Sequence, residues 1–176
     1  MLEDDSRLEH CPNCRSRRAL RNVYRCGDGH LFCEECAVSV LKRKRCLIPV
    51  SGYYEWQDTA SGKQPWYFTA RDGSPALTIA GLWDEWKNPE TGKPLKSCTM
   101  IITKPNQFVA QVHDRMPVLL TEDQFDPWLS GDTGIEYLKP APDDFLQKWP
   151  VSEKVNSSRA DDNDPTLIEK IELLAA

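Results

Sequence analysis

Two short segments of the sequence concentrate side chains that can move protons. In the first, SGYYEW at residues 51–56, the alternation of a β-strand would place Tyr53 and Glu55 on one face and Tyr54 and Trp56 on the other. A carboxylate on such an aromatic strand loses contact with water, which raises its pKa and suits it to proton transfer. The alternative is a glutamate on an edge strand that remains in water.

The second segment is VHDRMP at residues 112–117. An imidazole such as that of His113 titrates near neutral pH, so it can both give and take a proton. Asp114 could orient the imidazole, and Arg115 could bind a phosphate group through two parallel hydrogen bonds. The alternative is that His113 is a helix cap or a structural polar residue.

A cysteine-rich cluster precedes both segments. Cys11 and Cys14 form one Cys-x-x-Cys pair, and Cys33 and Cys36 form a second one eighteen residues later. Two such pairs can direct four thiolates at one ion, which is the ligand set of a closed tetrahedral zinc site. Because a segment of about 35 residues buries too little apolar area to fold unaided, a structural Zn²⁺ would also supply stability.

Cys26 and His30 lie between these pairs. Together the six residues have the order and spacing of the first six ligands of a RING-type cross-brace, whose second zinc would need two further ligands. Only Cys46 follows before Cys98, so the alternatives are a one-zinc ribbon and an incomplete RING-like module of a ubiquitin ligase. Protein docking, nucleic-acid contact and structural capping are all compatible with this module, and its protein partner is left open.

Composition sets the domain boundaries and the class of protein that we expect. The change in composition predicts a zinc-binding module at residues 1–40 and a larger domain at residues 41–176. The formal net charge is -5, so any DNA-binding surface must be local. No apolar run is long enough to span a membrane, and the acidic N-terminus does not resemble a signal peptide. Because neither a membrane span nor a signal peptide is predicted, we expect a cytoplasmic, nucleoid-associated protein, or a nuclear one if the source is eukaryotic.

Short apolar runs separated by turn residues predict an α+β fold that is mainly β. We expect strands at residues 46–57, 66–71, 76–83, 97–103, 116–120 and 167–171. Thr121 followed by Glu122, Asp123 and Gln124 predicts the start of a helix whose apolar face carries Phe125, Trp128 and Leu129. We also expect a shorter helix at residues 108–112 and a polar loop at residues 156–165.

Five sequence blocks in a fixed order resemble the signature blocks of the SOS response-associated peptidase (SRAP) family of abasic-site-processing proteins. They are RCLIPVSGYYEW, AGLWDEW, SCTMIITKPN, VHDRMPVLL and WPVSEKVN. The resemblance covers residues from about 45 to 172. It implies an SRAP-type β domain with short helices that lacks the family's N-terminal part.

The resemblance also implies a function. Proteins of this family bind single-stranded DNA at abasic sites and cross-link to it, and they are also described as peptidases. By the motifs, Glu55 and His113 would be the catalytic acid and base, Arg115 would contact a DNA phosphate, and Thr103 and Trp56 would lie in the DNA-binding site.

The sequence departs from the family at its nucleophile, which is an N-terminal cysteine exposed by removal of the initiator methionine. Residue 2 is Leu2 here, and the internal Cys46 has no free α-amine to replace it. The alternative hypothesis is therefore a non-catalytic, zinc-containing DNA- or protein-binding fusion, or a truncated remnant of the family.

Overall fold

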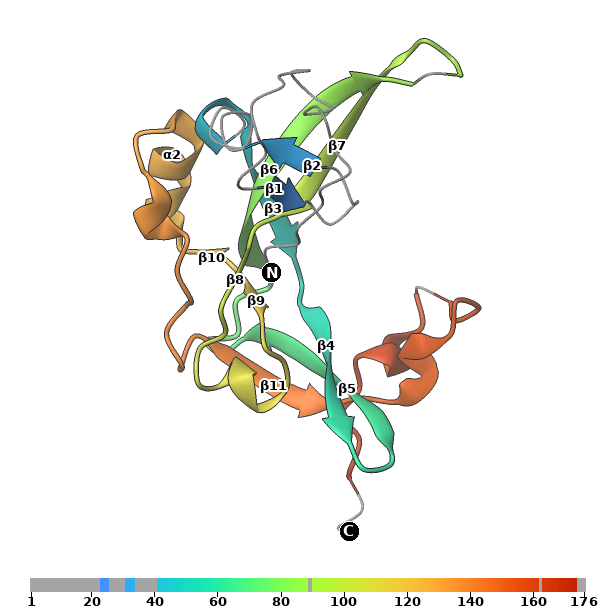
Figure 1. Cartoon of the computed structure of the whole chain (residues 1–176). Helices are drawn as coiled ribbons and strands as arrows, with labels where there is room; N and C mark the ends of the chain where they lie inside the picture. Colours follow the sequence, from blue (N-terminus) through green and yellow to red (C-terminus); the bar gives the residue numbers. More distant parts are fainter. Residues whose placement is uncertain (1–22, 26–30, 34–40, 89, 162, 174–176) are drawn as a thin grey trace. The chain divides into compact units, whose positions relative to one another are not determined.

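The computed structural model describes residues 23–25, 31–33, 41–88, 90–161 and 163–173 (Figure 1). The chain divides into two compact units, and each unit is assembled from three separate segments. Unit 1 comprises residues 1–48, 80–101 and 122–135, and unit 2 comprises residues 49–79, 102–121 and 136–176. Within the described residues, no helix has the length and apolar character needed to cross a membrane.

Unit 2 is built on a three-stranded antiparallel sheet in the order β11-β5-β4 (Figure 1). Its strands are β4 (Tyr53–Thr59), β5 (Gly62–Ala70) and β11 (Leu146–Pro150). In the register, Tyr53 lies opposite Phe68, and Phe68 lies opposite Lys148. Residues that face each other across an antiparallel pair share one face of the sheet, so these three side chains lie on the same face.

The predicted strand at residues 46–57 is two strands, and the prediction of a single one was wrong. The chain forms β3 (Arg45–Val50), turns at residues 51–52, and continues as β4. Gly52 lies so close to β5 that a Cβ atom there would be 2.4 Å from the Tyr67 hydroxyl oxygen and 2.5 Å from the Phe68 carbonyl oxygen. Only glycine fits where two backbone segments approach this closely.

Shorter elements complete unit 2. Strand β8 (Ile102–Thr103) pairs with β9 (Met116–Pro117), and β10 (Leu119–Leu120) pairs with the first residues of β6 (Leu77–Lys87). The 3-10 turns η1 (Val109–Gln111), η3 (Glu153–Asn156) and η4 (Pro165–Leu167) belong to this unit, and a further turn, η2 (Ile135–Tyr137), begins on the last residue of unit 1. The core side chains of this unit include Phe68, Ile79, Val109, Met116, Val118, Leu146 and Val151.

Unit 1 contains most of β3 and β6, strand β7 (Pro94–Met100) and helix α2 (Glu122–Ser130). Strand β7 pairs antiparallel with β6, so that Cys98 lies opposite Trp83. Two short strands, β1 (Val23–Arg25) and β2 (Leu31–Cys33), form a separate antiparallel pair.

A buried arginine connects β3 to helix α2 within unit 1. The Arg45 side chain is 8% exposed and lies 4.3 Å from the centre of the Trp128 ring. Its guanidinium donates hydrogen bonds to the Trp128 carbonyl oxygen, to the Thr133 hydroxyl and to the Thr133 carbonyl oxygen. Because a buried cation is stable only when its N–H groups are satisfied, this network fixes the end of α2 against β3.

The mainly β architecture with few short helices is confirmed. The helix predicted after Thr121 is confirmed as α2, but of its predicted apolar face Trp128 is buried while Leu129 is 48% exposed. The helix predicted at residues 108–112 is the 3-10 turn η1. The predicted strands at residues 97–103 and 116–120 are each divided in two, as β7 with β8 and as β9 with β10.

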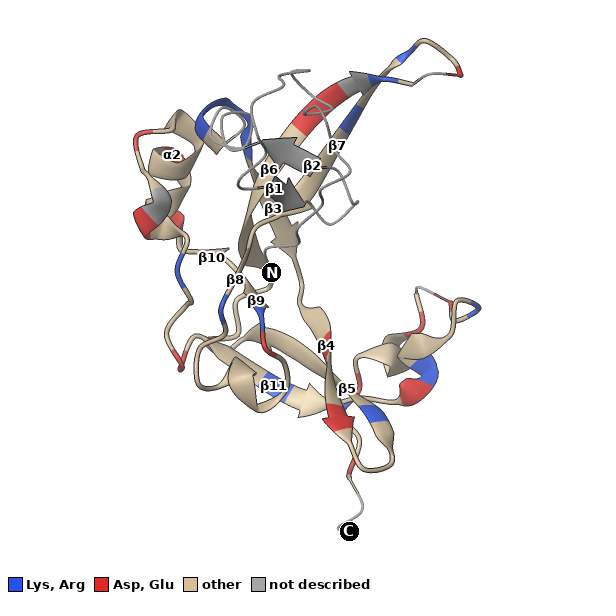
Figure 2. Cartoon of the chain, viewed as in Figure 1, with Lys and Arg blue, Asp and Glu red and all other residues tan. Residues whose placement is uncertain are grey.

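The strand predicted at residues 167–171 was wrong. Asp164 instead caps the turn η4, because its carboxylate accepts a hydrogen bond from the backbone N–H of Thr166, and Pro165 begins that turn. Strand β11, which the sequence analysis did not predict, takes the place next to β5. Charged side chains are few and scattered along the described elements, and no described element is uniformly basic (Figure 2).

Candidate functional site

Strand β4 carries the two-faced pattern that its sequence predicts. The Tyr53 ring stacks on Phe68 with a centroid distance of 5.1 Å, whereas the Tyr54 ring packs against Tyr67 at 5.3 Å. Glu55 therefore shares its face of the sheet with Tyr53, on a strand that is extended by pairing with β5. The Tyr53 hydroxyl is buried and has no hydrogen-bond partner among the described residues.

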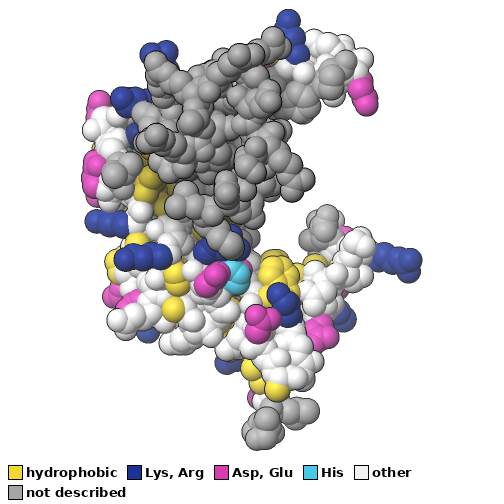
Figure 3. Space-filling view, in the orientation of Figure 1, with side chains coloured by type: hydrophobic (Ala, Val, Ile, Leu, Met, Phe, Trp, Pro, Cys, Tyr) yellow, Lys and Arg dark blue, Asp and Glu magenta, His cyan; other side chains and the backbone are white. Residues whose placement is uncertain are grey.

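Glu55 and His113 lie together in unit 2. The His113 Nε2 atom is 3.6 Å from the Glu55 Oε2 atom, and the two side chains are 27% and 21% exposed. His113 is placed by the turn η1, because its backbone N–H donates to the Val109 carbonyl oxygen at 3.0 Å. Figure 3 shows the imidazole reaching the surface; it is the one histidine within the described residues.

The surroundings of Glu55 favour its protonated form. Burial raises the pKa of the Glu55 carboxyl, and the charges of His113 and Arg115 act against this shift while Asp114 adds to it. A carboxyl group with a raised pKa holds a proton closer to neutral pH, which is what a general acid or base requires.

The hydrogen bonds of His113 assign its neutral tautomer. The backbone N–H of Arg115 donates to Nδ1 of His113 at 3.2 Å, so Nδ1 carries the lone pair and Nε2 carries the proton. That proton faces the Glu55 carboxylate. The Asp114 carboxylate, 3.3 Å from Nδ1, is placed to stabilise the imidazolium when both nitrogens are protonated.

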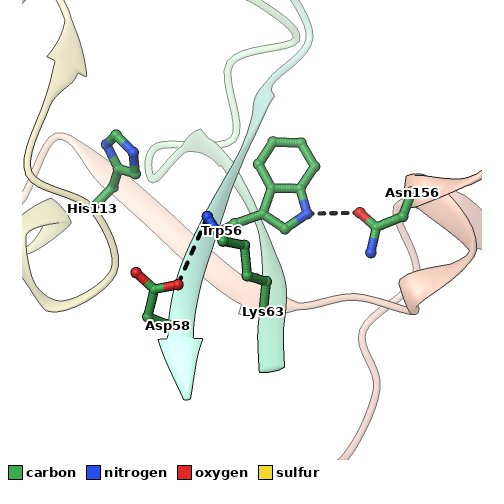
Figure 4. Close-up of a pocket in the computed structure, with 5 residues that line it drawn as sticks. All are labelled: Trp56, Asp58, Lys63, His113 and Asn156. Carbon is green, nitrogen blue, oxygen red and sulfur yellow. Dashed lines mark hydrogen bonds and ion pairs between the residues drawn. The ribbon is translucent and has the colours of Figure 1, made fainter. Parts of the chain in front are cut away.

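A cavity of about 340 Å³ lies beside this pair and is lined by Trp56, Asp58, Lys63, His113 and Asn156 (Figure 4). The Trp56 indole N–H donates to the Asn156 Oδ1 atom at 2.7 Å, and Lys63 pairs with Asp58 at 3.7 Å. The cavity thus combines an aromatic ring, a cation, a carboxylate and an amide next to an acid–base pair.

The remaining predicted site residues are Arg115 and Thr103. Arg115 follows His113 in the chain, and its side chain is 67% exposed and 3.5 Å from the Asp114 carboxylate. Thr103 lies in β8 opposite Met116, and its hydroxyl donates to the Leu138 carbonyl oxygen at 3.5 Å. In the described part of the chain, Thr103 makes no hydrogen bond to Glu55 or His113.

Three residues that line the cavity, Asp58, Lys63 and Asn156, were not predicted from the sequence. Asn156 ends the block WPVSEKVN, so its position in a signature block was a usable signal. Asp58 and Lys63 face each other across the β4–β5 hairpin, and that register was not predicted.

Of the residues predicted to bind zinc, Cys11, Cys14, Cys26, His30 and Cys36 lie outside the described residues. The backbone of Cys33 lies in β2, opposite Val23, while its side chain also lies outside the described set. Among the described residues there is no group of histidine, cysteine and acidic side chains that could hold a metal ion. The zinc site therefore stays a prediction.

Comparison with known proteins identifies related sequences. The profile of the family named SOS response associated peptidase (SRAP) matches residues 23–158. That match begins inside the segment predicted to form the zinc module.

The chain is 39% identical over 135 residues to the abasic site processing protein YoqW of Bacillus subtilis, which covers 73% of this chain and 58% of YoqW. It is 34% identical over 157 residues to the abasic site processing protein HMCES of Gallus gallus, which covers 76% of this chain and 46% of HMCES. The chain thus spans about half the length of these curated relatives.

Two crystal structures resemble the fold. A protein from Bacteroides thetaiotaomicron superimposes with a TM-score of 0.72 at 24% identity, covering 79% of this chain and 62% of that one. A protein from Bordetella bronchiseptica superimposes with a TM-score of 0.60 at 28% identity, covering 66% of this chain and 59% of that one.

Proposed function

The chain belongs to the SOS response associated peptidase (SRAP) family, and on that premise we propose that it processes abasic sites in single-stranded DNA. The observation that carries the proposal is the 3.6 Å separation of Glu55 and His113. These two residues come from separate signature blocks and share one acid–base site next to an open cavity.

The chemistry that we propose is the condensation of an amine with the aldehyde of the ring-opened abasic sugar. The amine nitrogen attacks the carbonyl carbon and gives a carbinolamine, which then loses water to give an imine. As the nitrogen attacks, Glu55 takes one N–H proton, and His113 in its doubly protonated form gives a proton to the oxygen. Glu55 then passes its proton to the hydroxyl group, which leaves as water, and His113 takes the remaining N–H proton, so both groups return to their starting forms. A neighbouring thiol that adds to the imine closes a stable thiazolidine ring.

Glu55 and His113 can transfer protons, but neither is the amine nucleophile of this reaction. Our proposal therefore assigns to the described residues the proton transfers and the binding of DNA. The family's name also suggests a peptidase activity. We propose this activity only where a nucleophile is present beside Glu55 and His113.

For the DNA strand, we propose contacts with Trp56, Arg115 and Thr103. The exposed guanidinium of Arg115 supports a phosphate contact, because a planar cation can donate two hydrogen bonds to one phosphate. Trp56 lines the cavity next to His113, where its ring could stack on a base. Thr103 is supported only by its signature block.

The test supplies the nucleophile from outside. An abasic single-stranded oligonucleotide is incubated with cysteine methyl ester, a small aminothiol, and formation of the DNA adduct is followed by mass spectrometry. We expect the protein to accelerate adduct formation, and we expect E55Q and H113Q to lose about 10²–10⁴-fold of that acceleration, the contribution typical of general acid–base catalysis.

The control is K170M, which removes an exposed lysine of the same unit. It should leave the acceleration unchanged. Equal rates with the wild-type protein, with both site variants and with buffer alone would contradict the proposed function.

We also propose, from the cysteine spacing alone, that Cys11, Cys14, Cys33 and Cys36 bind one structural Zn²⁺. Metal analysis of the purified protein should then find one zinc per chain, and C14S should lose it. A second zinc that is lost in C26S would assign Cys26 and His30 to a further site. A protein with no zinc that folds normally would contradict the proposal.

A further inference from the structure

The half-buried Lys148 of β11 contacts aromatic rings and carbonyl groups. Its Nζ atom lies 4.2 Å from the centre of the Phe108 ring, 5.7 Å from that of Trp66 and 5.8 Å from that of Phe68. The same nitrogen donates hydrogen bonds to the Phe108 carbonyl oxygen at 2.7 Å and to the Gln111 Oε1 atom at 2.8 Å. An ammonium group fits this environment, because ring faces and carbonyl oxygens both attract a cation.

The sheet register places Lys148 on the face that carries the acid–base pair. Lys148 lies opposite Phe68, and Phe68 lies opposite Tyr53. Tyr53 and Glu55 are two residues apart on β4, so their side chains point to the same side. Lys148 and Glu55 therefore project from one face of the same three-stranded sheet.

Both hydrogen-bond acceptors of Lys148 belong to the segment that ends at His113. Phe108 precedes the turn η1, and Gln111 is its last residue. The backbone N–H groups of Val112 and His113 both donate to the Val109 carbonyl oxygen, at 2.8 and 3.0 Å. The position of η1 thus determines the position of His113.

A second connection holds the same turn. The Gln57 side chain of β4 donates to the Gln111 carbonyl oxygen at 2.9 Å, and the Trp66 indole N–H donates to Gln57 Oε1 at 3.1 Å. Lys148 from β11 and Gln57 from β4 therefore hold Gln111 from two strands. Of the two, Lys148 contributes charge-assisted hydrogen bonds, which are about twice as strong as neutral ones.

We propose that Lys148 is a positioning residue that holds the turn η1 on the sheet and thereby keeps His113 within reach of Glu55. Burial lowers the pKa of the Lys148 amine, while its two carbonyl acceptors favour the charged form that the arrangement needs. That Lys148 supports catalysis through His113 rests on the proposed function. That Lys148 holds the turn η1 on the sheet does not.

The test reads out His113 directly and needs no DNA. The ring signals of His113 are recorded by NMR in the wild-type protein, in K148M, in K148R and in the control K170M, with assignment by H113Q. We expect K148M to move the His113 signals and to broaden those of the η1 backbone, K148R to restore part of the wild-type spectrum, and K170M to change neither.

A further control lies on the other face of β11. The indole N–H of Trp149 donates to the Ile168 carbonyl oxygen, and its signal should stay in place in K148M. If that signal moves as much as those of His113, the substitution disturbs the sheet as a whole and the positioning role is overturned. Unchanged His113 signals in a folded K148M protein would overturn it as well.

If K148M does not fold, Q111L answers the same question. This variant keeps Lys148 and removes one of its acceptors, so the His113 signals should move away from their wild-type positions. Unchanged His113 signals in Q111L would then overturn the proposal. Because none of these measurements involves DNA, failure of the aminothiol assay would count against the proposed function alone.

Discussion

Glu55 of β4 lies directly opposite Trp66 of β5 in the antiparallel register. The carboxylate therefore has an indole ring as its neighbour on the sheet and one imidazole, that of His113, at 3.6 Å. Burial raises the pKa of Glu55, and the opposing charge of His113 limits that rise. The charge of Glu55 thus depends on its burial first and then on the positions of His113, Arg115 and Asp114.

The raised pKa of Glu55 predicts a pH-dependent cost in stability. As the pH rises above the ordinary glutamate value, the unfolded chain loses the Glu55 proton before the folded protein does, so the folded state binds more protons and becomes less stable. E55Q has no such titration. We expect E55Q to gain stability relative to the wild type as the pH rises through this window, measured by urea denaturation at a series of pH values. A difference that does not depend on pH would contradict the prediction.

Arg115 predicts a specific salt dependence of DNA binding. If its exposed guanidinium contacts one phosphate, R115A should weaken binding to single-stranded DNA for every sequence alike. The slope of log K against log salt concentration should become shallower by about 0.7, the value for one phosphate contact on a single strand. Fluorescence anisotropy titrations measure this slope. R71A, which removes another exposed arginine of unit 2, should keep the wild-type slope.

Cys46 and Cys98, the two cysteines whose side chains the structure describes, should differ in reactivity. Cys98 is exposed on β7, whereas Cys46 is partly buried and burial raises the pKa of its thiol. Because the thiolate is the reactive form, iodoacetamide should modify Cys98 first in the folded protein. Peptide mass spectrometry after short labelling times checks this order. Equal rates for both cysteines in the folded protein, rather than only in denaturant, would be inconsistent with it.

The Arg45 network predicts a large effect on stability. R45L should destabilise the protein by about 1.5–3 kcal/mol, because it removes hydrogen bonds from a charged group and leaves buried carbonyl oxygens unsatisfied. T133V removes only the hydroxyl and should cost about 1 kcal/mol. R43L, at an exposed position two residues earlier, should change stability by less than about 0.5 kcal/mol. Denaturant unfolding compares the three variants.

Local patterns predicted the parts of the fold that depend on near neighbours. The alternation of Tyr53, Tyr54, Glu55 and Trp56 is visible in the sequence and is confirmed by the stacking of Tyr53 on Phe68 and of Tyr54 on Tyr67. The helix after Thr121 is likewise encoded by its own first turn. The break at Gly52 was missed because it depends on Tyr67, which lies close to it only after β4 and β5 have paired.

The sequence blocks identified individual site residues, but they did not predict how those residues lie relative to one another. Glu55 and His113 were each identified as candidates, whereas their 3.6 Å separation depends on where the turn η1 lies on the sheet. Strand β11 was not predicted, so nothing in the sequence analysis indicated that Lys148 would lie near η1. Residues that act through tertiary contacts carry no local sequence signal.

The interleaving of the two units has a consequence for how the protein is made. Each unit takes its three segments from distant parts of the chain, so neither is complete until residues near 135 in unit 1, or beyond 136 in unit 2, have been synthesised. A ribosome-bound nascent chain therefore cannot finish one unit before it begins the other. We expect slow folding, because contacts between distant segments must form before either core is closed.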